Sequence, residues 1–447
     1  MPSGGSPIAR VQSLLPTAPG RRARPADWSW LGPVLVVAVF ALLTWYQAAA
    51  LTPDPDRMPL EHWRYVRWAL ADLEAQGWTP DAETPAGLPE DPVQLRPGGG
   101  MLAAPLPLWP ALEAPGAFTR LVEGSPGGPR NDIRAIYLTG SSAGNQAFME
   151  RVFKLAETSQ INAVVIDVKD NSGRTTYPSQ IPAVLAANAS GGPIRDLAAL
   201  FVECEKRGIY TIGRLVVFAD PALGAARPEL AIHSLAGGLW RDQTRHGWTN
   251  PYSREVWEYN LAIAAEVAAL GCREIQFDYV RFPSDGRMDL VYYPVRTDEK
   301  RPEVIEGFLR RAREALAPYG VFTAADVFGL VTSFTVDMNI GQLLENVARQ
   351  VDFVCPMMYP SHYAPGNYGI PDPDAEPYLT IRTGLLHALA RLDGYETIIR
   401  PWLQDFSWRH KYGVNEVKAQ IRAAGELGVG GFMLWNPRNV YTEAAVK

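Results

Sequence analysis

Short apolar runs rich in β-formers alternate with helical stretches along residues 132–447. Several of the helical stretches end in a glycine directly before the next apolar run, at Gly208, Gly271, Gly320 and Gly428. Glycine tolerates the left-handed backbone conformation that closes a helix. The repeated order of helix, glycine and strand therefore predicts βαβ units and a parallel sheet.

Eight strands and seven helices are expected in this region, which predicts a closed (β/α)₈ TIM barrel. The strands are expected at residues 134–139, 163–168, 210–217, 274–280, 321–327, 353–359, 397–402 and 431–435. The helices are expected at residues 145–158, 194–207, 254–270, 303–317, 341–350, 378–392 and 415–427. For an eighth helix only the short tail 442–447 is left. An open doubly wound sheet is the alternative, but the segment TGSSAGN after the first strand lacks the usual GxGxxG spacing.

A membrane segment is expected near the N-terminus. Residues 30–51 carry no charge and are long enough to cross the hydrocarbon layer. Trp30 and Trp45 flank the run as interfacial aromatics, and arginines in residues 1–29 precede it. The positive-inside rule then predicts a cytoplasmic N-terminus, a single-pass anchor and an extracytoplasmic remainder. A cleaved signal peptide with small residues at 48–50 is the alternative, and it would give a secreted protein.

Residues 52–131 separate this run from the barrel. They begin with a helical pattern and continue into Pro- and Gly-rich sequence, which is typical of a linker. The domain boundary is placed near Asp132, so that residues 132–447 form the barrel.

The composition limits the function classes. Apolar residues make up 47% of the chain and charged residues 20%, as in an ordinary globular protein. The formal net charge of −6 and the lack of a basic stretch in the barrel argue against a nucleic-acid partner. Cys204, Cys272 and Cys355 lie in apolar surroundings without CxxC spacing, so we expect buried free thiols and no zinc site.

Carboxylates lie at the ends of the predicted strands, where TIM barrels place their active sites. Asp278 lies in the fourth predicted strand and Asp326 in the fifth, both near the C-terminal end of their strand. Two carboxylates across a cleft are what glycoside hydrolysis requires: one protonates the leaving oxygen, and the other attacks the anomeric carbon or activates water. We therefore assign Asp326 as general acid and Asp278 as nucleophile or base.

Salt bridges are the structural alternative, because a buried charge needs a partner. In that interpretation Asp278 pairs with Arg281, or Asp326 pairs with Arg214 or Lys169. The cations could also combine a structural and a functional role. They would pair with a carboxylate and lower its pKa, which would keep that carboxylate ionised as a nucleophile.

Further polar and aromatic residues at the strand ends are expected to bind a sugar, through stacking on its C–H faces and hydrogen bonds to its hydroxyls. These are Asp167, Lys169, Arg214, Tyr279, Arg281, Tyr359, His362, Trp402, Gln404, Trp435 and Asn436. Histidine is scarce, and only His362 lies at the end of a predicted strand, which argues against a His-rich metal site and against Ser-His-Asp catalysis. No metal, cofactor or obligate protein partner is expected.

The fourth-strand segment EIQFDYVRFPSD, residues 274–285, resembles the signature of a bacterial glycoside hydrolase domain family with a TIM-barrel fold. Supporting matches are AIYLTG at 135–140, VIDVKD at 165–170, WTNPY at 248–252 and DFVCPMMYPSHY at 352–363. The resemblance implies a barrel with glycoside hydrolase activity from about residue 134 to the C-terminus.

A fainter resemblance is to chitinase-like barrels, which share the Asp on strand four, a Met-x-Tyr on strand six and a Trp on strand eight. Where that group carries its acid Glu, this chain has Arg281. Substrate-assisted cleavage of N-acetyl sugars is therefore not expected, and the acid must come from another strand.

The first hypothesis is a glycosidase acting on an extracellular or cell-envelope polysaccharide. The second is a non-catalytic barrel that binds carbohydrate in the envelope. A third is a metal-dependent deacetylase or phosphoesterase in which Asp167, Asp278 and Asp326 hold a hard cation.

Overall fold

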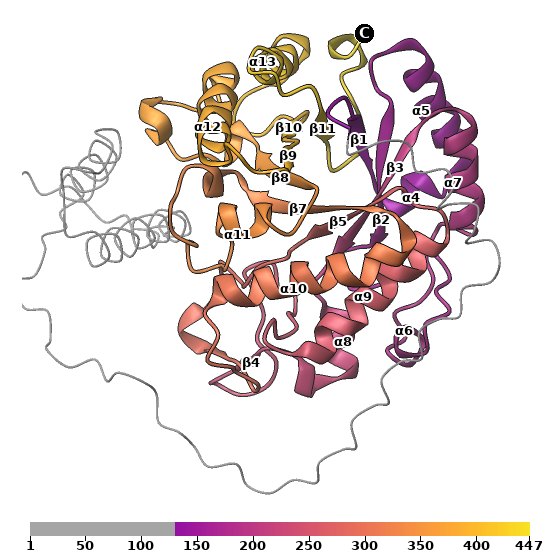
Figure 1. Ribbon diagram of the computed structural model, residues 1–447, viewed down its shortest axis with the longest axis vertical. Helices are drawn as coiled ribbons and strands as arrows, with labels where there is room; N and C mark the ends of the chain where they lie inside the picture. The colour runs from indigo at the N-terminus through magenta and orange to yellow at the C-terminus, as the bar shows by residue number, and fades with distance from the viewer. Residues whose placement is uncertain (1–129) are drawn as a thin grey trace, which may run out of the picture. The chain divides into compact units, whose positions relative to one another are not determined.

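A computed structural model describes residues 130–447, and Figure 1 shows strands at the centre with helices around them. The strands begin and end within a few residues of the predicted positions. They are β1 (Arg134–Leu138), β2 (Ala163–Lys169), β3 (Tyr210–Val216), β5 (Glu274–Asp278), β7 (Phe322–Phe328), β8 (Phe353–Met358), β9 (Ile398–Ile399), β10 (Trp402–Gln404) and β11 (Phe432–Trp435).

The sheet closes on itself. Neighbouring strands pair in parallel from β1 through β2, β3, β5 and β7 to β8. β8 pairs with both β9 and β10, β10 pairs with β11, and β11 pairs with β1. Since β9 and β10 are two pieces of one strand, the cylinder has eight parallel strands, and the prediction of a (β/α)₈ barrel is confirmed.

The seventh strand is interrupted at Arg400 and Pro401. Proline has no N–H to donate to a ladder, so pairing breaks there although the chain stays extended. The Arg400 N–H donates to the Val354 carbonyl at 2.9 Å, and the Pro401 carbonyl accepts from Met433 N at 2.9 Å. The Arg400 N–H and the Pro401 carbonyl thus still bond to neighbouring strands.

Helices alternate with the strands along the chain and connect one strand to the next. The main ones are α5 (Gln146–Thr158), α7 (Leu197–Lys206), α9 (Arg254–Ala269), α10 (Arg301–Leu316), α11 (Leu344–Ala348), α12 (Pro377–Arg391) and α13 (Val414–Gly425). Asn145 and Asp196 cap α5 and α7 by accepting from backbone N–H groups at 3.0 and 2.9 Å. The four glycines predicted to close helices all have positive φ, between 62° and 104°.

Three parts differ from the expected pattern. The helix expected at 341–350 is reduced to α11, and a 3₁₀ turn at Glu443–Ala445 stands where an eighth helix would lie. The short helices α4 (Gly140–Ala143), α6 (Pro182–Ala186) and α8 (Pro221–Ala226) lie in loops that follow strands. A small antiparallel pair, β4 (His233–Ser234) with β6 (Val291–Tyr292), joins two further loops.

Two apolar cores result from the alternation of side chains along the strands. One fills the barrel interior and includes Val165, Ile212, Phe353, Trp402 and Met433. The other lies between the strands and the surrounding helices. The three cysteines are free and buried, as expected.

The predicted cytoplasmic segment 1–29, anchor 30–51 and most of the linker segment 52–131 lie outside the described residues. Among residues 130–447, none of the helices combines the length and apolarity that a membrane crossing requires.

Candidate active site

Four charged side chains meet inside the barrel near the C-terminal ends of neighbouring strands. Asp278 is the last residue of β5, and Asp326 lies in the adjacent β7. Asp167 in β2 pairs in register with Arg214 in β3. All four are buried, with 1–5% of their surface exposed.

Arg214 joins two of the carboxylates. Its Nε and Nη2 donate to Asp278 Oδ2 at 2.8 and 2.5 Å, and its Nη1 donates to Asp167 Oδ1 at 2.6 Å. The negative charges of Asp278 and Asp167 outweigh the burial that disfavours the cation, so the pKa of Arg214 stands well above its usual value. A permanent positive charge thus lies between the two acids. Asp278 is therefore paired with Arg214, and not with Arg281 as the salt-bridge alternative supposed.

Asp326 is held differently. Trp402 Nε1 donates to its Oδ1 at 2.7 Å, while its Oδ2 has no hydrogen-bond partner among the described residues and is buried. Burial raises the pKa of Asp326 well above its usual range, and the negative charge of Asp278 adds to that rise. Arg214 and the Trp402 hydrogen bond lower the pKa but do not cancel the rise. The raised pKa favours the protonated form of Asp326, which is the form a general acid needs.

The backbone after Asp278 is unusual. Tyr279 has φ +50°, and its N–H donates to Asp278 Oδ1 at 2.6 Å. A bulky residue in the left-handed region is uncommon and costs free energy. Both oxygens of Asp278 thus accept hydrogen bonds, and the Tyr279 ring turns to where its hydroxyl accepts from Asn171 at 3.3 Å.

Tyr137, on β1, was not among the predicted site residues. Its hydroxyl donates to Asp167 Oδ2 at 2.6 Å, and its ring stacks on Trp435 with centroids 4.0 Å apart. The Arg214 guanidinium lies 5.7 Å from the Tyr137 ring and 5.4 Å from the Trp435 ring. An inward position two residues before the end of the first predicted strand was the only sequence signal for Tyr137.

Tyr359 and Trp402 complete the interior wall. Burial raises the pKa of Tyr359 well above its usual value, and the negative charges of Asp326 and Asp278 add to that rise. Trp402 packs edge-on against Trp435 at 5.5 Å between centroids. His362 is exposed and lies 5.3 Å from Tyr359, ring to ring.

Arg281 lies apart from the carboxylate pair. Its guanidinium is surrounded by the rings of Phe328, Trp248 and Tyr279 at 4.5, 5.0 and 5.1 Å. Its Nη1 donates to the Phe282 carbonyl at 3.0 Å. Burial lowers its pKa, although the Tyr279 hydroxyl and nearby acids oppose that effect.

The structure does not bring Lys169 to this cluster. The register of β2 against β3 shifts between Asp167 and Lys169, and this β-bulge turns Lys169 out of the barrel. There its Nζ contacts Asp220 Oδ2 at 2.7 Å and Asn260 Oδ1 at 3.0 Å. Its charge is neutralised between β3 and α9, so it has no access to a sugar inside the barrel.

The side-chain amides of Gln404 and Asn436 form hydrogen bonds with the backbone of loops. The amide of Gln404 accepts from Ser361 N at 3.1 Å and donates to the Phe406 carbonyl at 3.0 Å. Asn436 donates to the carbonyls of Asp405 and Val440 at 2.5 and 2.6 Å. Both side chains thus hold the backbone of the loops after β8, β10 and β11, and their amide groups are already hydrogen-bonded.

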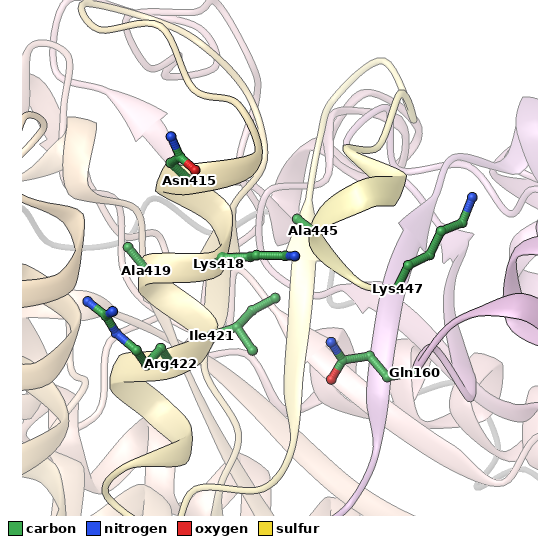
Figure 2. Close-up of a pocket in the computed structure, with 8 residues that line it drawn as sticks. All are labelled: Gln160, Asn415, Lys418, Ala419, Ile421, Arg422, Ala445 and Lys447. Atoms are coloured by element: carbon green, nitrogen blue, oxygen red, sulfur yellow. The ribbon is translucent and has the colours of Figure 1, made fainter.

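A cavity of about 610 Å³ lies elsewhere, on the flank of the barrel. Figure 2 shows it between α13 and the C-terminal residues, with Lys418 reaching across it. Its lining contains no Asp or Glu side chain, so it offers no acid for glycoside hydrolysis.

A metal centre is not formed by the three aspartates. Within residues 130–447, no group of three His, Cys, Asp or Glu side chains is placed to hold an ion. Arg214 occupies the space between Asp167 and Asp278 where such an ion would have to lie.

A family model described as "Putative glycosyl hydrolase domain" matches residues 135–441. Among solved structures, the chain is similar to the glycoside hydrolase domain of PgaB (BpsB) from Bordetella bronchiseptica, with 14% identity and a TM-score of 0.50 over 70% of this chain and 99% of that one. It is also similar to a hypothetical protein from Ruminiclostridium thermocellum, with 38% identity and a TM-score of 0.40 over 43% of this chain and 97% of that one. No curated protein matches the chain.

Proposed function

Because the chain belongs to this family of glycosyl hydrolase domains, we propose that it cleaves a polysaccharide with Asp326 as general acid and Asp278 as nucleophile or base. One observation carries the assignment. The two carboxylates lie on adjacent strands of one barrel interior and are held differently. Asp278 is paired with the Arg214 cation, whereas Asp326 accepts from an indole N–H in surroundings that raise its pKa. Such a pair of carboxyls with different roles is what glycosidic cleavage needs.

The proton transfer follows from the contacts. Asp326 Oδ1 accepts from Trp402, which leaves Oδ2 to carry the proton toward the leaving oxygen. As that oxygen departs, positive charge develops at the anomeric carbon, and the carboxylate of Asp278 faces it or activates a water. Arg214 orients Asp278 through two hydrogen bonds to a single oxygen.

The substrate in this proposal is an extracellular or cell-envelope polysaccharide. The uncharged run at residues 30–51, with arginines before it, supports a barrel held outside the cytoplasm by a membrane anchor. Protease added to intact cells should then digest the barrel, and washing with high salt should not release it from the membrane. Cleavage by a signal peptidase would instead give a soluble, shortened protein.

The test is release of new reducing ends from a panel of purified cell-envelope and extracellular polysaccharides by the full chain. Wild-type protein should cleave at least one, and Asp278→Asn and Asp326→Asn should each lose about 10²- to 10⁴-fold in kcat/KM. Far-ultraviolet circular dichroism of each variant checks that the barrel still folds. Equal turnover by wild type and both variants would remove the assignment.

A non-catalytic carbohydrate-binding barrel is the second candidate. It is favoured by one observation, namely that both oxygens of Asp278 already accept hydrogen bonds from the protein. In that case a polysaccharide would be retained by the wild type without any reducing ends being released.

A further inference from the structure

Trp408 is a large apolar side chain that the fold leaves in solvent. It lies in the loop after β10, and 65% of its surface is exposed. Contiguous exposed apolar surface commonly marks a binding site, whereas a single exposed ring does not, so the neighbours of Trp408 decide what its exposure means. Its position is informative because β10 also carries Trp402, the hydrogen-bond donor to Asp326.

A continuous series of rings connects Trp408 with the carboxylates. Trp435 lies 6.4 Å from Tyr359, Tyr359 lies 5.3 Å from His362, and His362 lies 5.3 Å from Trp408, all between ring centroids. Phe406 packs beside this series, 5.9 Å from Tyr359. We call Trp435, Tyr359, His362 and Trp408 the aromatic track. It begins beside Arg214 in the barrel and ends in solvent.

The two loops that carry the outer half of the aromatic track are fastened to each other. Arg409, the residue after Trp408, donates from Nη2 to the carbonyls of Ser361 and Tyr363 at 2.9 and 3.3 Å. The Ser361 N–H in turn donates to Gln404 Oε1 at 3.1 Å. These bonds flank His362 on both sides, so the track is held in place before a ligand arrives and binding costs little ordering entropy.

We propose that the aromatic track binds sugar units beyond the scissile bond, so that the substrate is a polysaccharide chain cleaved internally and not a disaccharide or a terminal sugar. This inference rests on the proposed function, because it extends the same site. The C–H faces of successive sugar rings stack on aromatic side chains, while their hydroxyls stay in water. Trp408 then forms the outermost subsite on this side of the barrel.

The continuity with the carboxylates favours a glycan over a protein segment as the occupant. A ligand that covers Trp408 and His362 lies beside Tyr359. From there the rings continue through Trp435 to Arg214, which is hydrogen-bonded to Asp278. A sugar chain that follows this path places a glycosidic bond at Asp326, whereas a docked peptide would block the same mouth. A peptide occupant therefore predicts inhibition where a glycan occupant predicts turnover.

The experiment uses the full chain and a ladder of oligosaccharides, prepared by size fractionation from a polysaccharide that the wild type cleaves. Trp408→Ala should lower kcat/KM for the polysaccharide and the longest oligomers by roughly two- to tenfold, mainly through KM. It should change little for the shortest oligomer that is cleaved. Trp408→Phe should restore most of the loss, because a smaller ring still stacks.

Tyr292→Ala is the matched control, since it removes another exposed aromatic ring, on β6, outside the aromatic track. It should leave the dependence on chain length as in the wild type. A Trp408→Ala variant that acts on long and short oligomers with the same kcat/KM ratio as wild type would overturn the inference and leave the proposed function standing. If the wild type cleaves no polysaccharide at all, the proposed function fails and this inference fails with it.

Discussion

Arg214 donates two hydrogen bonds to a single oxygen of Asp278, from Nε at 2.8 Å and from Nη2 at 2.5 Å. The third donor of the same guanidinium holds Asp167, and Tyr137 holds Asp167 from the other side. Asp326 has no cation hydrogen-bonded to it among the described residues, only the indole N–H of Trp402. The two carboxyls of one barrel interior thus differ in environment, because one is hydrogen-bonded to a cation and the other is buried without one.

The pH profile should report the protonated state of Asp326. Because burial raises the pKa of Asp326, kcat/KM should fall on the alkaline side with an apparent pKa well above that of an ordinary carboxyl group. The Trp402 hydrogen bond lowers that pKa by favouring the ionised form. Trp402→Phe should therefore move the alkaline limb to higher pH, which pH-dependent kinetics would record. A limb that moves to lower pH would contradict this role of Trp402.

Stability should respond to Asp326→Asn in a pH-dependent way. A carboxyl whose pKa is raised on folding binds its proton more tightly in the folded state, so it stabilises fully at low pH and loses that contribution as pH rises toward the folded pKa. Asparagine has no such loss. The free energy of unfolding of the variant, minus that of wild type, should therefore increase from about pH 4 upward. Urea denaturation at several pH values measures the difference, and a constant difference would argue against a raised pKa.

Arg214→Met should damage both stability and activity. It leaves Asp167 and Asp278 buried without their cation, which costs on the order of 3–5 kcal/mol of unfolding free energy. The folded fraction should also lose turnover, because Asp278 is no longer oriented. Arg287→Gln is the control, since the ion pair of Arg287 with Asp289 is exposed, and its urea midpoint should match that of wild type.

Lys169→Met should damage stability alone. It strands the buried carboxylate of Asp220, which again costs about 3–5 kcal/mol. Because Lys169 lies outside the barrel, kcat/KM per folded molecule should stay near the wild-type value. Active-site titration or native-fraction correction separates the two effects. If Lys169→Met instead raised KM and left the free energy of unfolding unchanged, Lys169 would have to contact the sugar, and this prediction would be wrong.

The order of strands and helices could be predicted because it depends on local patterns: apolar runs, glycines at helix ends and strand-sized spacing. The gathering of Asp278 and Asp326 could also be predicted, because parallel strands of a closed barrel bring their carboxyl ends to one face. Their different environments depend on Trp402 and Arg214, whose contacts with them span 76 and 64 residues of sequence.

Lys169 shows why the remaining details could not be predicted. Strict alternation places Lys169 on the same face as Asp167, which lies two residues earlier. The bulge between them reverses that face, and a bulge leaves no periodic signal in the sequence. The role of Tyr137 was missed for a related reason, since a tyrosine at an inward strand position is usually a core residue.

The division of roles between Asp326 and Asp278 is tested most directly by leaving-group dependence. The substrates are the polysaccharide that wild type cleaves and the 2,4-dinitrophenyl glycoside of its sugar, whose leaving group departs without protonation. Asp326→Asn should lose about 10²- to 10⁴-fold on the polysaccharide yet keep most of its turnover on the activated glycoside, while Asp278→Asn should lose both. An Asp326→Asn variant that cleaves the polysaccharide like wild type, or that loses both substrates equally, would contradict the assignment.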